Sequence, residues 1–314
     1  MGSIKKTSTE VTNTEHEKKG HEIARVIPFH MNDIHDAWAG KDYSSFPSFM
    51  SICLGRLIYL SNTIFIPFAT DAALSFEFAL KTGIHMSNGA LSSGEENAFR
   101  NWLQLLSKSL PIQMKRTHDI INLLLENFSV ATQSQSDMDR LINRNISVEP
   151  KRSWHTCTYG DNKMGYTCGL WQLFHIMSVG VVEYNRHNPP IPTRHASETL
   201  RNYIEHFFQC EVCRLNFLDM YDTCAFGGCH RLSDKPASTE REWIELPMWL
   251  WETHNDVNVR LMGERLEQNK ALKPNLWEVQ QARWPSLVAC PDCWREDSSW
   301  EEERVFEHLH KLFW

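Results

Sequence analysis

Apolar residues recur at intervals of three and four along the first half of the chain, which is the spacing of one helix face. Breaks at Pro67, at 83–93 and at Pro111 separate the helical segments. We therefore expect a small helical bundle between Pro47 and Phe128. Its two clearest stripes are Phe49, Cys53, Leu57 and Leu60, and Phe99, Leu103, Leu106 and Leu110.

The second half of the chain also has helical patterns and few convincing strands. The predicted fold class is therefore all-α, with no internal repeat. The last helix, over 305–313, is amphipathic, and the helix before it is expected to end at Gly263. One helix is expected to begin near Cys168 and another at Cys210. A third is expected to have Ser197 as its N-cap, with Glu198 in the first turn, and a fourth to have Pro247 in its first turn.

Composition divides the chain of 314 residues into three parts. Residues 1–25 have no apolar periodicity and are predicted to form a disordered tail. Between Thr132 and Ser153 the chain becomes polar, as an interdomain linker would, which places a boundary near residue 150. We predict one helical domain with its linker over 26–150 and a second domain over 151–314.

Charge and hydropathy exclude several classes of protein. The chain has a net charge of -7 and no dense stripe of Lys and Arg, so nucleic acid is not an expected partner. No run of eighteen apolar residues occurs, so no membrane span is expected. The polar start of the chain, over 1–20, has no apolar core typical of a secretory signal.

The nine cysteines are the most informative residues, because eight of them form local pairs. Cys210 and Cys213 lie three apart at an expected helix start, where the helix N-terminus stabilises a thiolate and the pair can exchange disulfides. The same spacing also forms half of a zinc site. The pair by itself therefore leaves redox chemistry and zinc binding about equally supported.

A second Cys-x-x-Cys pair lies at Cys290 and Cys293. The separation from Cys213 is much longer than in compact zinc ribbons, which makes a shared zinc site the weaker alternative. The remaining pairs are local enough to close small disulfide loops. They are Cys157 with Cys168 and Cys224 with Cys229, and Cys53 is left over as a buried small residue.

An unusual helix face lies downstream of the first Cys-x-x-Cys pair. Trp251, His254, Asn255 and Asn258 share this face, and Arg260 follows two residues later. An aromatic plate beside three polar groups and a cation suits a planar heterocycle joined to phosphates. A cluster of paired polar groups between helices is the structural alternative.

Trp171 and His175 repeat the pairing of tryptophan and histidine on one helix face, because they lie four residues apart. A single histidine on such a face is usually a hydrogen-bonded core residue. Two such faces, with a Cys-x-x-Cys pair between them in the sequence, favour a cofactor site.

These residues, in this order, resemble the Erv/ALR sulfhydryl oxidase domain and, within that group, the quiescin sulfhydryl oxidases. The resemblance is strong over 151–314, whereas residues 30–130 are loosely similar to the cofactor-free helical domain that precedes it. The motifs are Cys168-Gly169-Leu170-Trp171-x-x-x-His175, Phe207-Phe208-Gln209-Cys210-x-x-Cys213, Trp251-x-x-His254-Asn255-x-Val257-Asn258, Trp284-Pro285 and Cys290-x-x-Cys293.

The resemblance implies an FAD held in a helical bundle, with Cys213 facing the flavin and Cys210 exchanging with substrate. It implies accessory disulfides between Cys157 and Cys168 and between Cys290 and Cys293, whereas Cys224 with Cys229 is an addition to the family pattern. Asn216 and Val212 stand where the family often has a histidine and an acidic residue. The implied cofactor contacts are Trp171, His175, Asn216, Trp251, His254, Asn255, Val257, Asn258, Arg260 and Trp284.

The implied reaction oxidises protein or small-molecule thiols to disulfides and reduces oxygen to hydrogen peroxide. Thioredoxin-like domains precede this region in the family, so the resemblance implies a fragment or a separate thioredoxin-like donor. It also implies the secretory pathway or the extracellular space, which the glycosylation triplets at Asn127 and Asn145 support weakly, and a monomer. The alternative function is an inactive helical interaction module, stapled by disulfides or stabilised by zinc.

Overall fold

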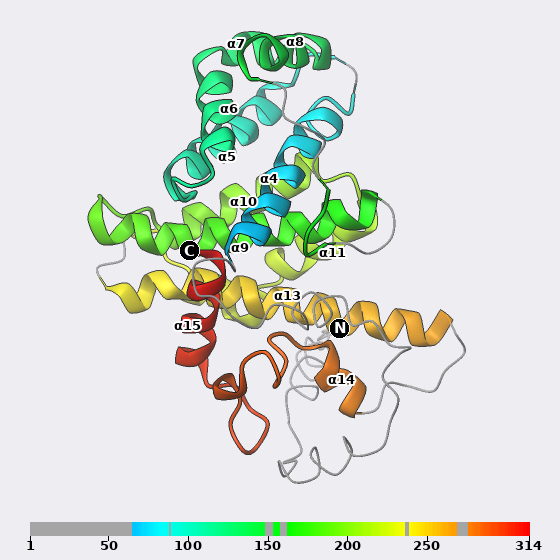
Figure 1. Cartoon of the computed structure of the whole chain (residues 1–314), viewed down its shortest axis with the longest axis vertical. Helices are drawn as coiled ribbons and strands as arrows, with labels where there is room; N and C mark the ends of the chain where they lie inside the picture. The colour runs from blue at the N-terminus through cyan, green and yellow to red at the C-terminus, as the bar shows by residue number, and fades with distance from the viewer. Residues whose placement is uncertain (1–64, 88, 148–152, 158–161, 236–238, 269–275) are drawn as a thin grey trace, which may run out of the picture.

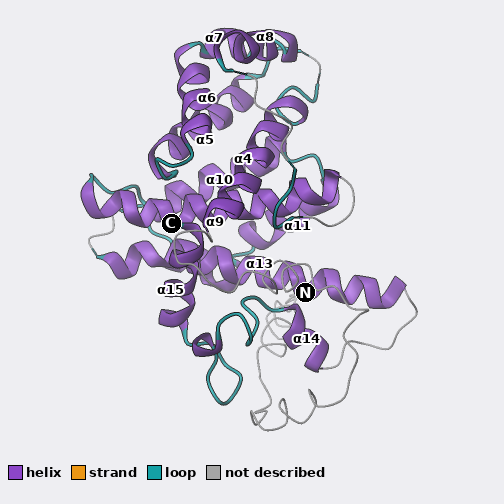
Figure 2. Ribbon diagram, viewed as in Figure 1, coloured by secondary structure: helices purple, strands orange, loops and turns teal. Residues whose placement is uncertain are grey.

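The computed structural model describes residues 65–87, 89–147, 153–157, 162–235, 239–268 and 276–314. In this part of the chain helices account for the regular structure, and the one β-bridge joins Trp294 to Trp300 (Figure 2). The all-α prediction is confirmed. The stripe that contains Phe49 and Cys53, and the expected disordered tail, lie outside the described residues.

The first group of helices gathers at one end of the molecule, and α4 runs from it onto α9 (Figure 1). A capping box begins α5, because Ser92 accepts from the backbone of Glu95 and the Glu95 carboxylate accepts from the backbone of Ser92. The predicted apolar stripe from Phe99 to Leu110 is buried. The helices of this group are α4 (Phe65–Thr82), α5 (Ser93–Ser109), α6 (Lys115–Glu126), α7 (Phe128–Ala131) and α8 (Gln135–Asn145).

The second group is built around two long helices, α9 (Asn162–His187) and α13 (Glu240–Gln268), which pack against each other. The closing helix α15 contacts both of them and also α4. The shorter elements of this group are α10 (Thr193–Phe207), α11 (Glu211–Asp222), η1 (Ala225–Gly227), α12 (Gly228–Arg231), α14 (Leu276–Ala282), η2 (Pro291–Cys293) and α15 (Glu302–Phe313).

One hydrophobic core runs through both groups of helices. Trp102 of α5 stacks on Tyr203 of α10 with ring centroids 4.5 Å apart and meets Phe174 of α9 edge-on. Phe68 of α4 meets Phe313 of α15 at 5.4 Å. The two-domain division stays a prediction, and the described parts on either side of residue 150 share this core.

Several local predictions were wrong. α9 begins at Asn162 rather than near Cys168, and α13 continues to Gln268, beyond its expected end at Gly263. The expected linker contains α8, which Ser134 caps and whose short apolar stripe of Met138, Leu141 and Ile142 packs against the core; the polar residues around this stripe led to the linker prediction. Ser197 lies inside α10 rather than at its start, because the backbone carbonyl of Ser233, distant in sequence, accepts from Arg194 in the first turn. Pro247 lies well inside α13, whose first turn is capped by Thr239 and Glu242.

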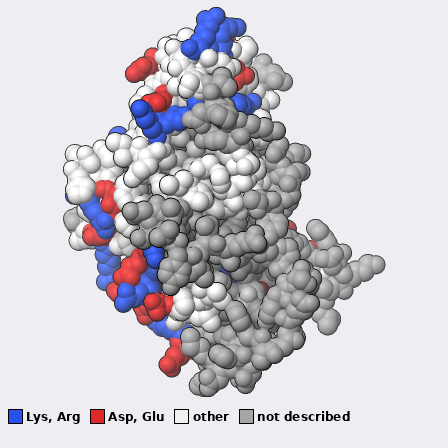
Figure 3. Space-filling view, in the orientation of Figure 1, with Lys and Arg blue, Asp and Glu red and all other residues white. Residues whose placement is uncertain are grey.

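The surface carries both kinds of charge. On the face in Figure 3, basic and acidic side chains lie next to one another. Ion pairs such as Arg201 with Asp222, 2.8 Å apart, and Arg116 with Glu77, 3.0 Å apart, join neighbouring helices. None of the helices described is long and apolar enough to cross a membrane.

A buried carboxylate joins the two groups of helices. Asp71 of α4 is inaccessible to solvent, and its oxygens accept from the backbone of His155, Thr156 and Cys157 and from the Thr156 hydroxyl, at 2.7 to 3.0 Å. Hydrogen bonds to an ionised acceptor are roughly twice as strong as neutral ones. Asp71 therefore fixes the turn that carries Cys157 into its disulfide with Cys168.

Asp71→Asn is expected to lower the free energy of unfolding by about 3 kcal/mol, because an amide NH₂ would replace one acceptor and face backbone donors. Urea unfolding measures the change. The matched control is Asp234→Asn, at a carboxylate that is mostly exposed, for which a change within about 0.5 kcal/mol is expected. Equal effects of the two substitutions would contradict the anchoring role of Asp71.

Candidate functional site

The Cys210–Cys213 disulfide lies at the start of α11, as predicted. Cys210 is the N-cap residue, and its sulfur accepts from the backbone N–H of Cys213 at 3.3 Å. Both cysteines are half-buried, with Cα atoms 5.2 Å apart. The unpaired N–H groups and the dipole of a helix N-terminus stabilise a thiolate there. The pair is therefore placed to open and close by thiol exchange.

Aromatic contacts join α11 and the segment just before it to both long helices. Phe208, just before the disulfide, lies 6.3 Å from Tyr166 of α9 between ring centroids. Phe217 and Tyr221 meet Trp249 of α13 edge-on at 6.3 and 5.7 Å. These contacts fix the disulfide relative to α9 and α13, the helices that carry the predicted Trp and His residues.

The two predicted Trp/His faces meet between α9 and α13. The indole of Trp171 and the imidazole of His254 are stacked, with centroids 4.1 Å apart and planes 2° from parallel. His175 Nε2 lies 2.9 Å from His254 Nδ1, so one ring donates to the other. We call Trp171, His175, Trp251, His254 and Trp284 the Trp–His cluster.

Trp284 joins the cluster through its backbone. Its carbonyl accepts from Trp251 Nε1 at 2.6 Å and from Asn255 Nδ2 at 2.7 Å, and its N–H donates to Asn255 Oδ1 at 2.6 Å. The Trp284–Pro285 peptide bond is cis. On the face of α13 that was predicted from spacing, Asn255 therefore has a structural role, because its side chain binds the backbone of Trp284.

Burial keeps the two histidines of the cluster neutral. Desolvation lowers the pKa of His175 to about 3. Desolvation, and then the proximity of His175, lower the pKa of His254 well below its ordinary value. His175 Nδ1 and Trp284 Nε1 have no hydrogen-bond partner among the described residues although both are buried. Such groups cost free energy unless a partner satisfies them.

These histidines predict an acid-sensitive fold. A free histidine has a pKa of about 6.5, so below that pH the unfolded chain takes up protons that folded His175 does not bind. The contribution of neutral His175 to the free energy of unfolding therefore has its full value above pH 6.5 and decreases as the pH is lowered toward 3. At pH 5 His175 alone is expected to cost about 2 kcal/mol relative to pH 7.

Urea unfolding between pH 7.5 and 5 tests this expectation in the wild type, in His175→Gln and in a control, His230→Gln, at an exposed histidine. His175→Gln is expected to flatten the dependence of unfolding free energy on pH. The control is expected to keep the wild-type slope. A wild-type stability that does not change with pH would contradict the assignment of buried, neutral histidines.

The other predicted cofactor residues lie around the cluster. Val257, Asn258 and Arg260 follow it along α13 and are half-buried, and Arg260 pairs with Glu264. Asn216 is half-buried on α11. No hydrogen bond or ring contact between described residues links these four side chains to the cluster, so their roles stay predictions.

Sequence reasoning missed three neighbours of Trp284. His308 of α15 lies 5.8 Å from the Trp284 ring, and its Nε2 has no partner among the described residues. Phe313 stacks on His175 at 5.1 Å. Arg283 is half-buried beside Trp284, and burial lowers its pKa. The amphipathic pattern of 305–313 predicted a buried face but not what that face would meet.

The segment that holds both the Cys210–Cys213 disulfide and the Trp–His cluster is similar to a known protein family. Residues 168–285 match the model of the Erv1 / Alr family. The chain contains an Erv1 / Alr family domain.

The similar proteins are longer than this chain. "Sulfhydryl oxidase 1" of Arabidopsis thaliana is 27% identical over 312 residues, which cover 93% of this chain and 54% of that protein. "Sulfhydryl oxidase 1" of Oryza sativa subsp. japonica is 30% identical over 167 residues, 51% of this chain and 28% of that protein. This chain therefore spans about half or less of these relatives.

A solved structure shares the fold. The "Sulfhydryl Oxidase Fragment of Human QSOX1" aligns with a TM-score of 0.59 and 20% sequence identity, over 82% of this chain and 97% of that chain. The alignment extends well beyond residues 168–285. It therefore includes helices of the first group together with the Erv1 / Alr domain.

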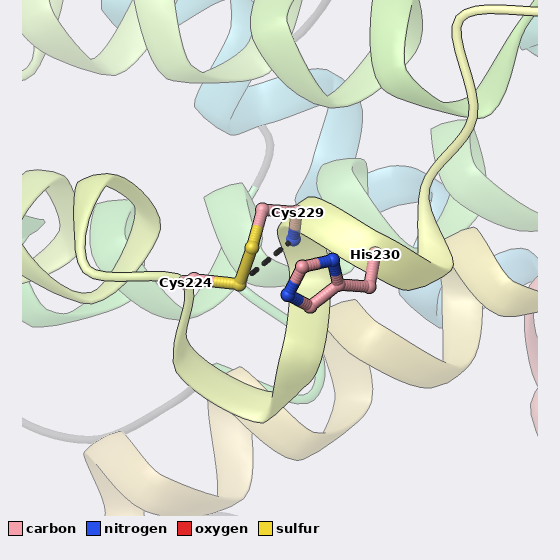
Figure 4. A group of neighbouring side chains, drawn as sticks. All are labelled: Cys224, Cys229 and His230. Atoms are coloured by element: carbon pink, nitrogen blue, oxygen red, sulfur yellow. Dashed lines mark hydrogen bonds between the residues drawn. A yellow bond between two sulfur atoms is a disulfide. The ribbon is translucent and has the colours of Figure 1, made fainter. Parts of the chain in front are cut away.

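Three further disulfides flank the Erv1 / Alr domain or lie within it: Cys157–Cys168, Cys224–Cys229 and Cys290–Cys293. Figure 4 shows the imidazole of His230 beside the Cys224–Cys229 bond, which closes a tight loop with left-handed backbone at Cys224 and Phe226. Among the described residues two groups of side chains have metal-ligand geometry, and each consists of two cysteines and one histidine. A zinc site shared by the two Cys-x-x-Cys motifs would need all four of their cysteines together. Neither group brings the two motifs together.

Proposed function

We propose that this chain is an FAD-dependent thiol oxidase that forms disulfides from thiols and reduces oxygen to hydrogen peroxide. The observation that carries the proposal is the Cys210–Cys213 disulfide at a helix N-terminus, fixed by aromatic contacts to the helices that bear the Trp–His cluster. The Erv1 / Alr match covers both features, and the relatives bear the name sulfhydryl oxidase.

The residues of the cluster fit a flavin nucleotide. Trp171, Trp251 and Trp284 offer flat apolar surfaces, and His175 Nδ1 and Trp284 Nε1 are buried polar atoms that lack a protein partner. A heterocycle with its own donors and acceptors would satisfy such atoms. Arg260 and the half-buried Arg283 are cations suited to the phosphates. We assign His254, Asn255, Val257, Asn258 and Asn216 to the same site.

Cys210 is the proposed exchange partner of the substrate. A substrate thiolate attacks its sulfur, forms a mixed disulfide and releases Cys213 as a thiolate, which the N-terminus of α11 stabilises. A second substrate thiolate then attacks the substrate sulfur of the mixed disulfide and releases Cys210. Re-formation of the Cys210–Cys213 disulfide releases an electron pair, for which a bound flavin would supply the two-electron acceptor and the route to oxygen.

The expected substrates are protein or small-molecule thiols, with a thioredoxin-like protein as a suitable donor. Four disulfides among the described residues favour an oxidising compartment, so we assign the chain to the secretory pathway or the extracellular space. The shared core between the two groups of helices supports a monomer, because α9 is covered by α4 and α5 of the same chain.

A visible spectrum combined with oxygen uptake tests the proposal. The purified protein is expected to be yellow, with an oxidised flavin band, and to consume oxygen when a small dithiol such as dithiothreitol is added. Catalase should return half of the oxygen, because the product is hydrogen peroxide. Colourless protein, or flavin without dithiol turnover, would instead support the inactive interaction module.

A further inference from the structure

Two large apolar side chains beside the redox disulfide are exposed. Val212, between the two cysteines, is 67% exposed, and Leu215, two residues after Cys213, is 57% exposed. They lie three apart and so share one face of α11. Among the exposed large apolar side chains of the described residues, no other two lie within one helical turn of each other in the sequence.

Exchange at Cys210 brings a substrate chain onto this face. In a mixed disulfide the Cα atoms of the joined cysteines lie about 5.5 to 6 Å apart, and each further substrate residue adds at most 3.8 Å. Val212 and Leu215 lie within about two helical turns of Cys210. Side chains next to the substrate cysteine therefore come within reach of both.

Carboxylates border the apolar pair. Glu211 and Asp219 are exposed and lie four residues before and four after Leu215, on the same side of the helix. The face therefore presents an apolar centre with negative charge toward both ends. Such a face matches a segment that has an apolar side chain beside its cysteine and a basic side chain further along.

We propose that Val212 and Leu215 form a docking surface that selects protein dithiols whose reactive cysteine is next to a large apolar residue. The inference rests on the proposed function, and it names the class of substrate. Burial of the apolar pair by the substrate residue favours that substrate over a polar one. About tenfold in kcat/KM corresponds to about 1.4 kcal/mol, which the partial burial of one leucine supplies.

The test uses the full flavin-loaded chain and two dithiol peptides that differ at one position, with Leu or Ser beside the first cysteine. Wild type is expected to prefer the Leu peptide about tenfold in kcat/KM. Val212→Thr with Leu215→Gln preserves side-chain size and should bring the ratio to about one. Because the ratio is taken on one enzyme, a change in the disulfide itself cancels.

The matched control is Val130→Thr with Ile112→Gln, at exposed apolar residues of the first group of helices, which should keep the tenfold ratio. A wild type that turns over both peptides equally, or a docking variant with an unchanged ratio, would overturn the inference. Turnover of dithiothreitol by the wild type is measured in parallel. If it is absent the proposed function fails, whereas if it is present only the docking surface is in question.

Discussion

Cys213→Ser is expected to abolish thiol-dependent oxygen uptake, to less than about one thousandth of the wild-type rate, while the bound flavin and its visible band are retained. A serine hydroxyl neither ionises near neutral pH nor forms an exchangeable bond with Cys210, so no electron pair leaves the dithiol. The side chain is of similar size and lies at the half-buried start of α11. The fold should therefore persist, as circular dichroism can verify.

Removal of a different disulfide provides the control. The Cys224–Cys229 pair lies beyond the opposite end of α11 from Cys210, so Cys224→Ser with Cys229→Ser should keep most of the oxygen uptake. Oxygen electrode measurements with dithiothreitol compare the two variants. Activity that survives Cys213→Ser, or that is lost only with the Cys224–Cys229 pair, would show that the redox disulfide is wrongly assigned.

Gly180→Ala is expected to be the most destabilising single-methyl change in the described core. A Cβ on Gly180 would lie 1.6 Å from the backbone carbonyl oxygen of Ser109 and 3.0 Å from the Trp314 ring. Backbone atoms cannot move aside as a flexible side chain can, so α9 and α5 would have to separate. We expect a loss of about 3 kcal/mol or more in the free energy of unfolding.

Replacement of glycine by alanine at another site should raise the free energy of unfolding rather than lower it. A Cβ on Gly263 of α13 meets no atom within 4 Å, and alanine favours the helix interior by about 0.5 to 1 kcal/mol relative to glycine. Urea unfolding midpoints of both variants measure the contrast. If Gly180→Ala is as stable as Gly263→Ala, then the close crossing of α5 and α9 is not a feature of the folded chain.

The sequence predicted the helical class and the buried stripe of α5 because both follow from local periodicity. It also predicted α11 and α15, where the capping cysteine and the amphipathic pattern lie within the helix itself. It failed at the starts of α9, α10 and α13, at the end of α13 and at α8. In α10 the first turn is completed by Ser233, and in α8 the apolar stripe of Met138, Leu141 and Ile142 is short and surrounded by polar residues.

For the candidate site, helix spacing predicted which residues share a face, and it grouped Trp171 with His175 and Trp251 with His254. The hydrogen bond between His175 and His254 joins residues 79 apart in the sequence. The contact of His308 with Trp284 likewise depends on how α15 packs. No local pattern contains these distances, so they could not be read from the chain.

The sequence by itself determined the chemistry that is available here: a Cys-x-x-Cys pair at a helix start and two faces that each carry tryptophan and histidine. Only the tertiary structure decided which of those groups meet, which are buried and which stay exposed. The reason is that helix periodicity is a local property, whereas burial, the lowered pKa of His175 and the unpartnered atom of Trp284 arise from the packing of α9, α13 and α15. The Cys-x-x-Cys pair itself was recognisable from four consecutive residues. Those residues alone did not distinguish redox chemistry from zinc binding, and the surroundings of the pair come from the tertiary structure.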